Sequence, residues 1–121
     1  MAYTKVTITA WPSTSPPNED VNITVLIQNI YSYGFYANCI CIVEGKRIID
    51  WQRKWIAAGA KQPFYGEFIM PSKDTPVTAY SYYEGPDGTV YYDAEASIVV
   101  KLESIGAAEF RSFSCSYGRV S

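Results

Sequence analysis

The chain has 121 residues, of which 48% are hydrophobic and 18% charged, so it predicts one globular domain and excludes a disordered or fibrous chain. A net charge of −2 with scattered basic residues argues against nucleic acid as a partner. No stretch approaches the ~20 apolar residues that cross a bilayer, and the N-terminal residues lack the pattern of a secretory signal peptide.

Alternating apolar and polar residues predict strands over most of the chain. In chain order the predicted strands are residues 3–11, 21–29, 37–43, 47–55, 64–70, 77–84 and 89–102. The Pro-rich segment 12–20 bars a helix or a central strand, and residues 85–88 (GPDG) have the composition of a hairpin turn. No window predicts a helix. Seven short strands at this spacing are typical of an antiparallel β-sandwich.

Residues 103–121 lie beyond the sandwich, which is predicted to occupy residues 1–102. Within this C-terminal extension Phe113 and Tyr117 alternate with serines, which indicates an extended segment. We expect either an extra strand of the same domain or an arm that adds a strand to the sheet of a neighbouring subunit. In the second case, removing residues 104–121 should leave a folded domain that no longer assembles.

Three stretches of the chain occur in an order known from one family. They read VTITAWPSTSPPNEDVNITVLIQN, ANCICIVEGKRI and FYGEFIMPSKDTPVTAYSYYEGPDGTVYYDAEASIVVKL. Together, over about residues 4–102, they resemble the CARDB-type (cell-adhesion-related) immunoglobulin-like domains of archaea and bacteria.

The resemblance implies an immunoglobulin-like sandwich of about seven strands that serves adhesion, spacing or assembly, with no catalytic residues to carry over. Such domains usually belong to long secreted chains. Virus and phage structural proteins also use immunoglobulin-like domains, and they assemble inside the cell. The missing signal therefore favours a virion component over a secreted adhesin.

The groups that enzymes commonly use are missing or scattered. The sequence has no His, which excludes His-dependent catalytic and metal sites, and it has no phosphate-binding Gly-rich motif. Carboxylates gather near the predicted hairpin at Glu84, Asp87, Asp93 and Glu95. Their expected roles are solubility and turn chemistry, with a weak Ca²⁺ site and catalysis as alternatives that the spacing does not support. We predict no enzyme activity, no cofactor and no metal.

The three cysteines, Cys39, Cys41 and Cys115, are an odd number and do not predict a disulfide framework. Cys39 and Cys41 should face the same side of one strand and be buried as small hydrophobic side chains. A bridge from Cys115 to one of them is the alternative.

Trp51, Arg53 and Trp55 alternate along one predicted strand and should share a face with Arg47 and Ile49. One interpretation places one Trp in the core under the Arg stems. The other is an exposed contact patch, because aromatic residues and Arg are enriched in interface cores.

Five tyrosines flank the predicted hairpin turn: Tyr80, Tyr82, Tyr83, Tyr91 and Tyr92. Strict alternation predicts that Tyr92 faces the core, whereas Tyr91 faces outward with Asp93 and Glu95. Of the adjacent Tyr82 and Tyr83, one must point outward. We expect another subunit to cover Tyr91 and that outward tyrosine.

These observations favour a non-enzymatic structural protein that packs into a larger assembly, such as a virion capsid, decoration or tail component or an extracellular filament. Its partners would be further copies or other subunits. The interface candidates are Trp51, Arg53, Trp55, Tyr82, Tyr83, Tyr91, Phe113 and Tyr117. The alternative is a carbohydrate-binding or cell-adhesion module, which requires an exposed aromatic row beside Asp or Asn side chains.

Overall fold

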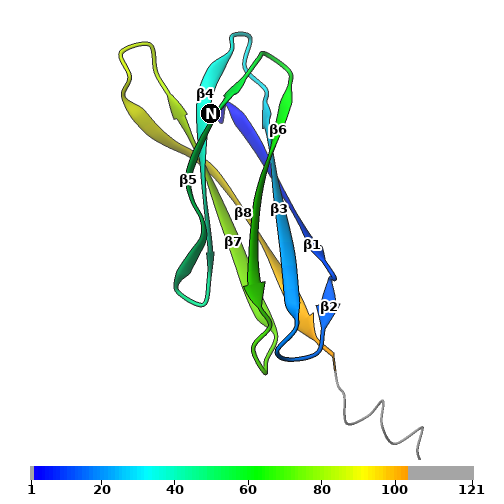
Figure 1. Cartoon of the computed structure of the whole chain (residues 1–121). Coiled ribbons are helices and arrows are strands. Elements are labelled where there is room, and N and C mark those ends of the chain that lie inside the picture. The colour runs from blue at the N-terminus through cyan, green and yellow to red at the C-terminus, as the bar shows by residue number, and fades with distance from the viewer. Residues whose placement is uncertain (1, 104–121) are drawn as a thin grey trace, which may run out of the picture.

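The computed structural model describes residues 2–103 as a sandwich of two β-sheets (Figure 1). The strands are β1 (Thr4–Trp11), β2 (Thr14–Ser15), β3 (Asp20–Asn29), β4 (Phe35–Val43), β5 (Lys46–Ile56), β6 (Lys61–Ile69), β7 (Thr75–Glu84) and β8 (Val90–Leu102). One sheet has the order β1-β3-β6 and the other the order β2-β8-β7-β4-β5. All pairs are antiparallel except β2 with β8, which is parallel.

Strand β3 shows how alternation builds the core. Val21, Val25 and Ile27 are fully buried between the sheets, whereas the intervening polar side chains lie on the outside. Phe64 of β6 and Val77 of β7 are buried as well and belong to the same core cluster. Each such side chain contributes about 1.5–3 kcal/mol through burial, so this continuous core holds the sheets together.

The predicted all-β sandwich is confirmed, and the number of strands is corrected from seven to eight. The additional strand, β2, lies inside the Pro-rich segment that the sequence predicts to be a turn. It pairs only with residues 101–102 at the end of β8, and this edge position tolerates neighbouring prolines. Strand β6 begins at Lys61 instead of residue 64 and includes Pro63, again on an edge strand.

Strand β8 ends at Leu102. Residues 104–121, with Phe113, Cys115 and Tyr117, lie outside the described residues, so the predicted C-terminal arm stays a prediction. Within residues 2–103 there is no helix long and apolar enough to cross a membrane.

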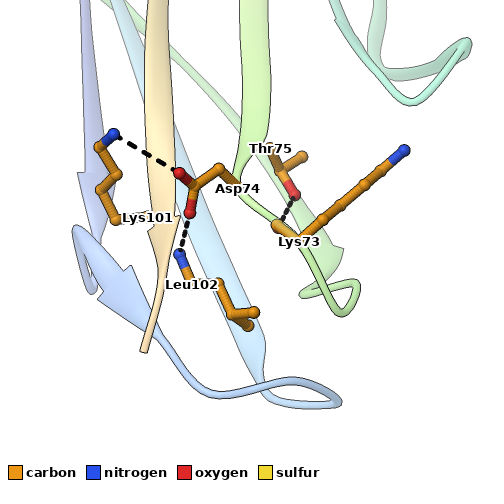
Figure 2. A network of polar contacts seen from close by, with 5 residues as sticks. All are labelled: Lys73, Asp74, Thr75, Lys101 and Leu102. Carbon is orange, nitrogen blue, oxygen red and sulfur yellow. Dashed lines mark hydrogen bonds and ion pairs between the residues drawn. The ribbon is translucent and has the colours of Figure 1, made fainter. Parts of the chain in front are cut away.

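The end of β8 is fixed to the loop between β6 and β7 (Figure 2). Asp74 Oδ1 accepts a hydrogen bond from the backbone N–H of Leu102 at 2.8 Å, and Asp74 Oδ2 lies 3.5 Å from Lys101 Nζ. The backbone bond from Leu102 is the main cause of a lowered pKa for Asp74. This end of the sandwich lies opposite the end that carries the N-terminus and the β7–β8 hairpin (Figure 1).

Candidate functional site

Aromatic side chains cover much of the outer side of the five-stranded sheet, and we name this surface the outer aromatic face. It consists of Tyr36, Trp51, Arg53, Trp55, Tyr80, Tyr82 and Tyr92. Its rings touch across strands: the Tyr82 ring centroid lies 5.0 Å from that of Trp51 and 5.9 Å from that of Tyr92. The Tyr36 and Trp55 centroids are 5.1 Å apart. The register therefore turns residues from four strands into one surface.

Trp51 occupies a β-bulge in β5. Asp50 pairs with Ile40 and Gln52 pairs with Cys39, so Trp51 is the extra residue. Its φ of 59° lies in the left-handed region, which costs an L-residue about 1–2 kcal/mol. The side chain remains 42% exposed, so core burial only partly offsets this cost. Strain of this kind often marks functional positions.

The bulge corrects the predicted face of this strand. Ile49, expected beside Trp51, is fully buried in the core, while Trp51 and Trp55 are both exposed. The interpretation that one of these tryptophans belongs to the core is therefore wrong. Arg53 stacks on Tyr36, with its guanidinium carbon 3.5 Å from the ring centroid, and this cation–π contact orients both side chains.

Arg53 also forms a two-point ion pair with Glu84 of β7. Its Nε donates to Glu84 Oε2 at 2.6 Å, and its Nη2 donates to Oε1 at 3.1 Å. The pair raises the pKa of Arg53 and lowers the pKa of Glu84. A planar guanidinium bound in this way has a fixed orientation, so two charges of opposite sign stand at a defined place among the rings.

Asn38 lies in the same row of the sheet, between its register partners Arg53 and Tyr82. It is fully buried, and neither its amide nitrogen nor its amide oxygen has a hydrogen-bond partner among the described residues. Arg53 is the main cause of the lowered pKa of Glu84, and the nearby Asn38 side chain acts in the same direction without meeting hydrogen-bond geometry. An unpaired buried amide costs about 1–3 kcal/mol of folding free energy, so Asn38 lowers the stability of the isolated domain.

A groove with a volume of about 850 Å³ adjoins this surface. It is lined by the N-terminus, the β3–β4 loop and the β7–β8 hairpin, three segments that lie at one end of the sandwich in Figure 1. We name it the end groove. Its lining residues are Tyr3, Tyr31, Tyr33, Gly34, Phe35, Tyr36, Arg53, Trp55, Tyr83, Glu84, Gly85, Pro86, Gly88 and Tyr91. Because Tyr36, Arg53 and Trp55 belong to both, the groove and the outer aromatic face are continuous.

Ring contacts organise the groove wall. Tyr3 lies edge-on to Tyr31 at 4.6 Å and to Tyr83 at 4.8 Å, and Tyr83 stacks on Tyr91 at 5.2 Å between centroids. Partial burial raises the pKa of Tyr83. The loop before β4 approaches Trp55 so closely that a Cβ on Gly34 would lie 2.5 Å from the ring. Glycine is therefore required there for the observed position of Trp55.

The structure corrects the prediction for Tyr92. Asp93 is an extra residue in β8, because Ser81 pairs with Ala94 whereas Tyr82 pairs with Tyr92. This bulge reverses the alternation: Tyr92 joins the outer aromatic face and is 53% exposed, and Tyr91 turns to the side of Tyr83. Tyr91 is still partly exposed, as predicted, but it does not share a face with Glu95.

Each of the four carboxylates near the hairpin has its own partner. Asp93 accepts hydrogen bonds from the backbone N–H groups of Tyr3 and Thr4 and from the Thr4 hydroxyl. Glu84 binds Arg53, Asp87 accepts the Thr89 N–H, and Glu95 accepts the Tyr92 hydroxyl at 2.6 Å. The bond to Glu95 raises the pKa of Tyr92 to about 12. Residues 2–103 contain no group of three or more side chains that could hold a metal ion.

Cys39 and Cys41 are fully buried free thiols on the core side of β4, as the spacing predicts. Burial raises the pKa of each to about 12. At neutral pH both stay protonated, and they act as small hydrophobic side chains.

Sequence reasoning misses Tyr3, Tyr31, Tyr33 and Asn38. The first three come together only because the N-terminus and the β3–β4 loop meet the β7–β8 hairpin. The repeated tyrosines of YSYGFY were the one available signal. Asn38 carries no signal, because a single polar residue in an apolar strand looks like ordinary variation.

Comparison with known protein families and with characterised proteins gives no match to this sequence. Solved structures do resemble it. A chain of the complex between zinc 2-glycoprotein and prolactin inducible protein from human seminal plasma aligns with a TM-score of 0.64 and 14% identity, over 83% of this chain and 93% of that chain.

Two further structures are similar. Native α2-macroglobulin from Escherichia coli gives a TM-score of 0.67 and 17% identity over 84% of this chain, which spans 17% of that longer one. A CARDB domain from Pyrococcus furiosus, solved with di-metal ions, gives a TM-score of 0.60 and 12% identity over 83% of this chain and 87% of that chain. The predicted CARDB-type resemblance is confirmed at the level of the fold: the chain is an immunoglobulin-like domain.

Proposed function

We propose that this domain is a non-enzymatic structural protein that packs into a larger assembly through its outer aromatic face. The observation that carries the proposal is Trp51, a bulky residue in a left-handed conformation whose ring is directed to the surface beside Tyr82. Such a conformation costs free energy in the isolated domain. Contact with a partner surface would offset that cost.

The contrast between the two outer surfaces supports this role. The outer side of the three-stranded sheet carries Thr7, Thr9, Asn22 and Thr24 together with two exposed aromatic residues, Trp11 and Tyr65. The five-stranded sheet instead presents a contiguous set of aromatic rings with one Arg. Large exposed aromatic patches of this kind are typical of interfaces.

The partner we propose is a second copy of the chain, related by a two-fold axis, because such an axis places the same surface on both sides of the interface. The net charge of −2 opposes self-association only weakly. Such a two-fold dimer is closed, so in a virion or an extracellular filament it would be the building block that a second contact joins to its neighbours. No catalytic role is proposed, since each hairpin carboxylate is already engaged by a neighbouring donor.

Sedimentation analysis of the purified full chain tests the proposal. We expect a species heavier than the 13.6 kDa monomer. The pair Trp51→Asn and Tyr92→Ser should weaken association about tenfold or more, which corresponds to 1.4 kcal/mol. Asn is chosen at residue 51 because it tolerates the left-handed conformation.

The matched control is the pair Trp11→Ser and Tyr65→Ser, which removes one Trp and one Tyr ring of greater exposure from the other sheet. This pair should leave association unchanged. A strictly monomeric chain at ~1 mM, or equal effects of the two pairs, would contradict the proposed interface.

A further inference from the structure

The end groove has the size and pre-formed walls of a small-ligand site. Its volume of about 850 Å³ lies within the ~300–1,000 Å³ that is usual for such pockets. The Tyr3 ring contacts the rings of Tyr31 and Tyr83. The Trp55 ring packs closely against Gly34. A ligand would therefore meet ordered rings, which lowers the entropic cost of binding.

The charges in the groove balance. Arg53 and Glu84 are the only charged side chains among its described lining residues, and they bind each other at two points. An anionic ligand near Arg53 would also meet Glu84, and a cationic ligand near Glu84 would meet Arg53. The groove consequently favours a neutral ligand with apolar faces.

The polar groups beside the rings are both donors and acceptors. Arg53 donates, Glu84 accepts, and the buried Asn38 amide behind them offers both functions without a partner of its own among the described residues. A sugar hydroxyl both donates and accepts, so neighbouring hydroxyls can satisfy all three groups. A proline-rich peptide presents mainly carbonyl acceptors and would leave Glu84 without a donor.

We propose that the end groove binds a neutral saccharide, with the apolar face of a sugar ring on the exposed Trp55 ring and its hydroxyls bonded to Arg53, Glu84 and Asn38. The bound sugar displaces one contact of the ion pair, which exposes the Asn38 amide and gives it a partner. The tyrosine wall contacts the adjoining sugar units. Arg53 and Trp55 also belong to the outer aromatic face, so we expect a bound sugar and self-association through that face to compete for these two side chains.

Titration of the full chain with neutral oligosaccharides tests the site. The probes are hexasaccharides of glucose, mannose, galactose and N-acetylglucosamine, followed by tryptophan fluorescence and by amide chemical shifts in NMR spectra. At least one should bind saturably with a Kd of about 10 μM to 1 mM, and the shifted amides should belong to residues that line the groove.

Variants separate the groove from the rest of the surface. Trp55→Ala and Tyr31→Ala should each weaken binding about tenfold or more, as for loss of one ring stacked on a ligand. Asn38→Val should weaken binding while the domain stays folded. The matched controls Trp11→Ala and Tyr65→Ala, on the other sheet, should leave the Kd unchanged.

The proposal is overturned if none of the four sugars binds at ~10 mM, or if Trp55→Ala and Trp11→Ala weaken binding equally. Binding of a proline decapeptide in place of the sugars would also overturn it and would assign the groove to peptides. Because Trp51→Asn removes the proposed interface but no groove residue, sugar binding by that variant separates failure of this site from failure of self-association.

Discussion

Two fully buried asparagines, Asn38 and Asn29, should respond in opposite ways to replacement by valine. The Asn29 amide donates to the carbonyl oxygens of Tyr33 at 2.9 Å and Ile56 at 3.0 Å, and it accepts the Tyr31 N–H at 2.8 Å. The Asn38 amide makes no hydrogen bond to any described residue. The two sites are equally buried, so they differ mainly in hydrogen bonding.

The expected magnitudes follow from that difference. Asn38→Val removes an unpaired amide that costs about 1–3 kcal/mol when desolvated, and valine suits the centre of a strand. We expect a gain in the free energy of unfolding of about 2 kcal/mol, or roughly 8 °C in Tm for a domain of this size. Asn29→Val removes three hydrogen bonds and should cost about 3 kcal/mol at ~1 kcal/mol each.

Urea unfolding followed by circular dichroism measures both changes, with unchanged m-values showing that the denatured state is comparable. If Asn38→Val loses stability as Asn29→Val does, then the Asn38 amide has a partner in the folded protein. The Asn38 amide would then be unavailable to a saccharide bound in the end groove.

Three further predictions concern stability and chemistry. Asp93→Ala should lower the free energy of unfolding by about 1.5–3 kcal/mol, because the hydrogen bonds from Tyr3 and Thr4 to a charged carboxylate are lost. Urea titration measures this free energy. An unchanged value would contradict the conclusion that Asp93 fixes the N-terminal backbone. Cys39 and Cys41 should not react with a thiol reagent in the native protein, so at most one of the three thiols is modified before unfolding; faster labelling would show that the core opens. The lowered pKa of Asp74 stabilises the fold above its unfolded value of about 3.9, and this contribution is lost as the pH falls through the lower folded value. Asp74→Asn should therefore flatten the dependence of Tm on pH below about 4, and an unchanged slope would contradict the assignment.

The fold class could be predicted because its signals are local. Alternation in β3 and the turn residues before β8 each act over a few positions, and their order along the chain is enough to indicate a sandwich. The start of β6 could not be predicted from the sequence, since Lys61, Gln62 and Pro63 do not alternate in hydrophobicity. Their strand conformation comes from pairing with β3, which is a tertiary effect.

The candidate site could be predicted only in part, because two bulges reverse the alternation on which the sequence argument depends. Trp51 and Asp93 are extra residues in β5 and β8, and neither is a residue type that favours a bulge. Each placement is decided by contacts remote in sequence: the Trp51 ring by Tyr82, and the Asp93 carboxylate by the N-terminal backbone. A prediction from strict alternation therefore assigns Tyr91 and Tyr92 to the wrong sides of the sheet.

The position of the unfavourable features is itself informative. The strained Trp51 and the unpaired Asn38 both lie on the outer side of the five-stranded sheet, within reach of the same row of residues. A single substitution would remove either feature. Trp51→Gly would remove the backbone strain, and Asn38→Val would remove the unpaired amide, so each should stabilise an isolated domain. Stability alone would remove both features, so their occurrence on one surface favours a binding role for that surface. The outer side of the opposite sheet also carries exposed rings, Trp11 and Tyr65, but neither of these two features: Trp51 and Asn38 belong to the five-stranded sheet.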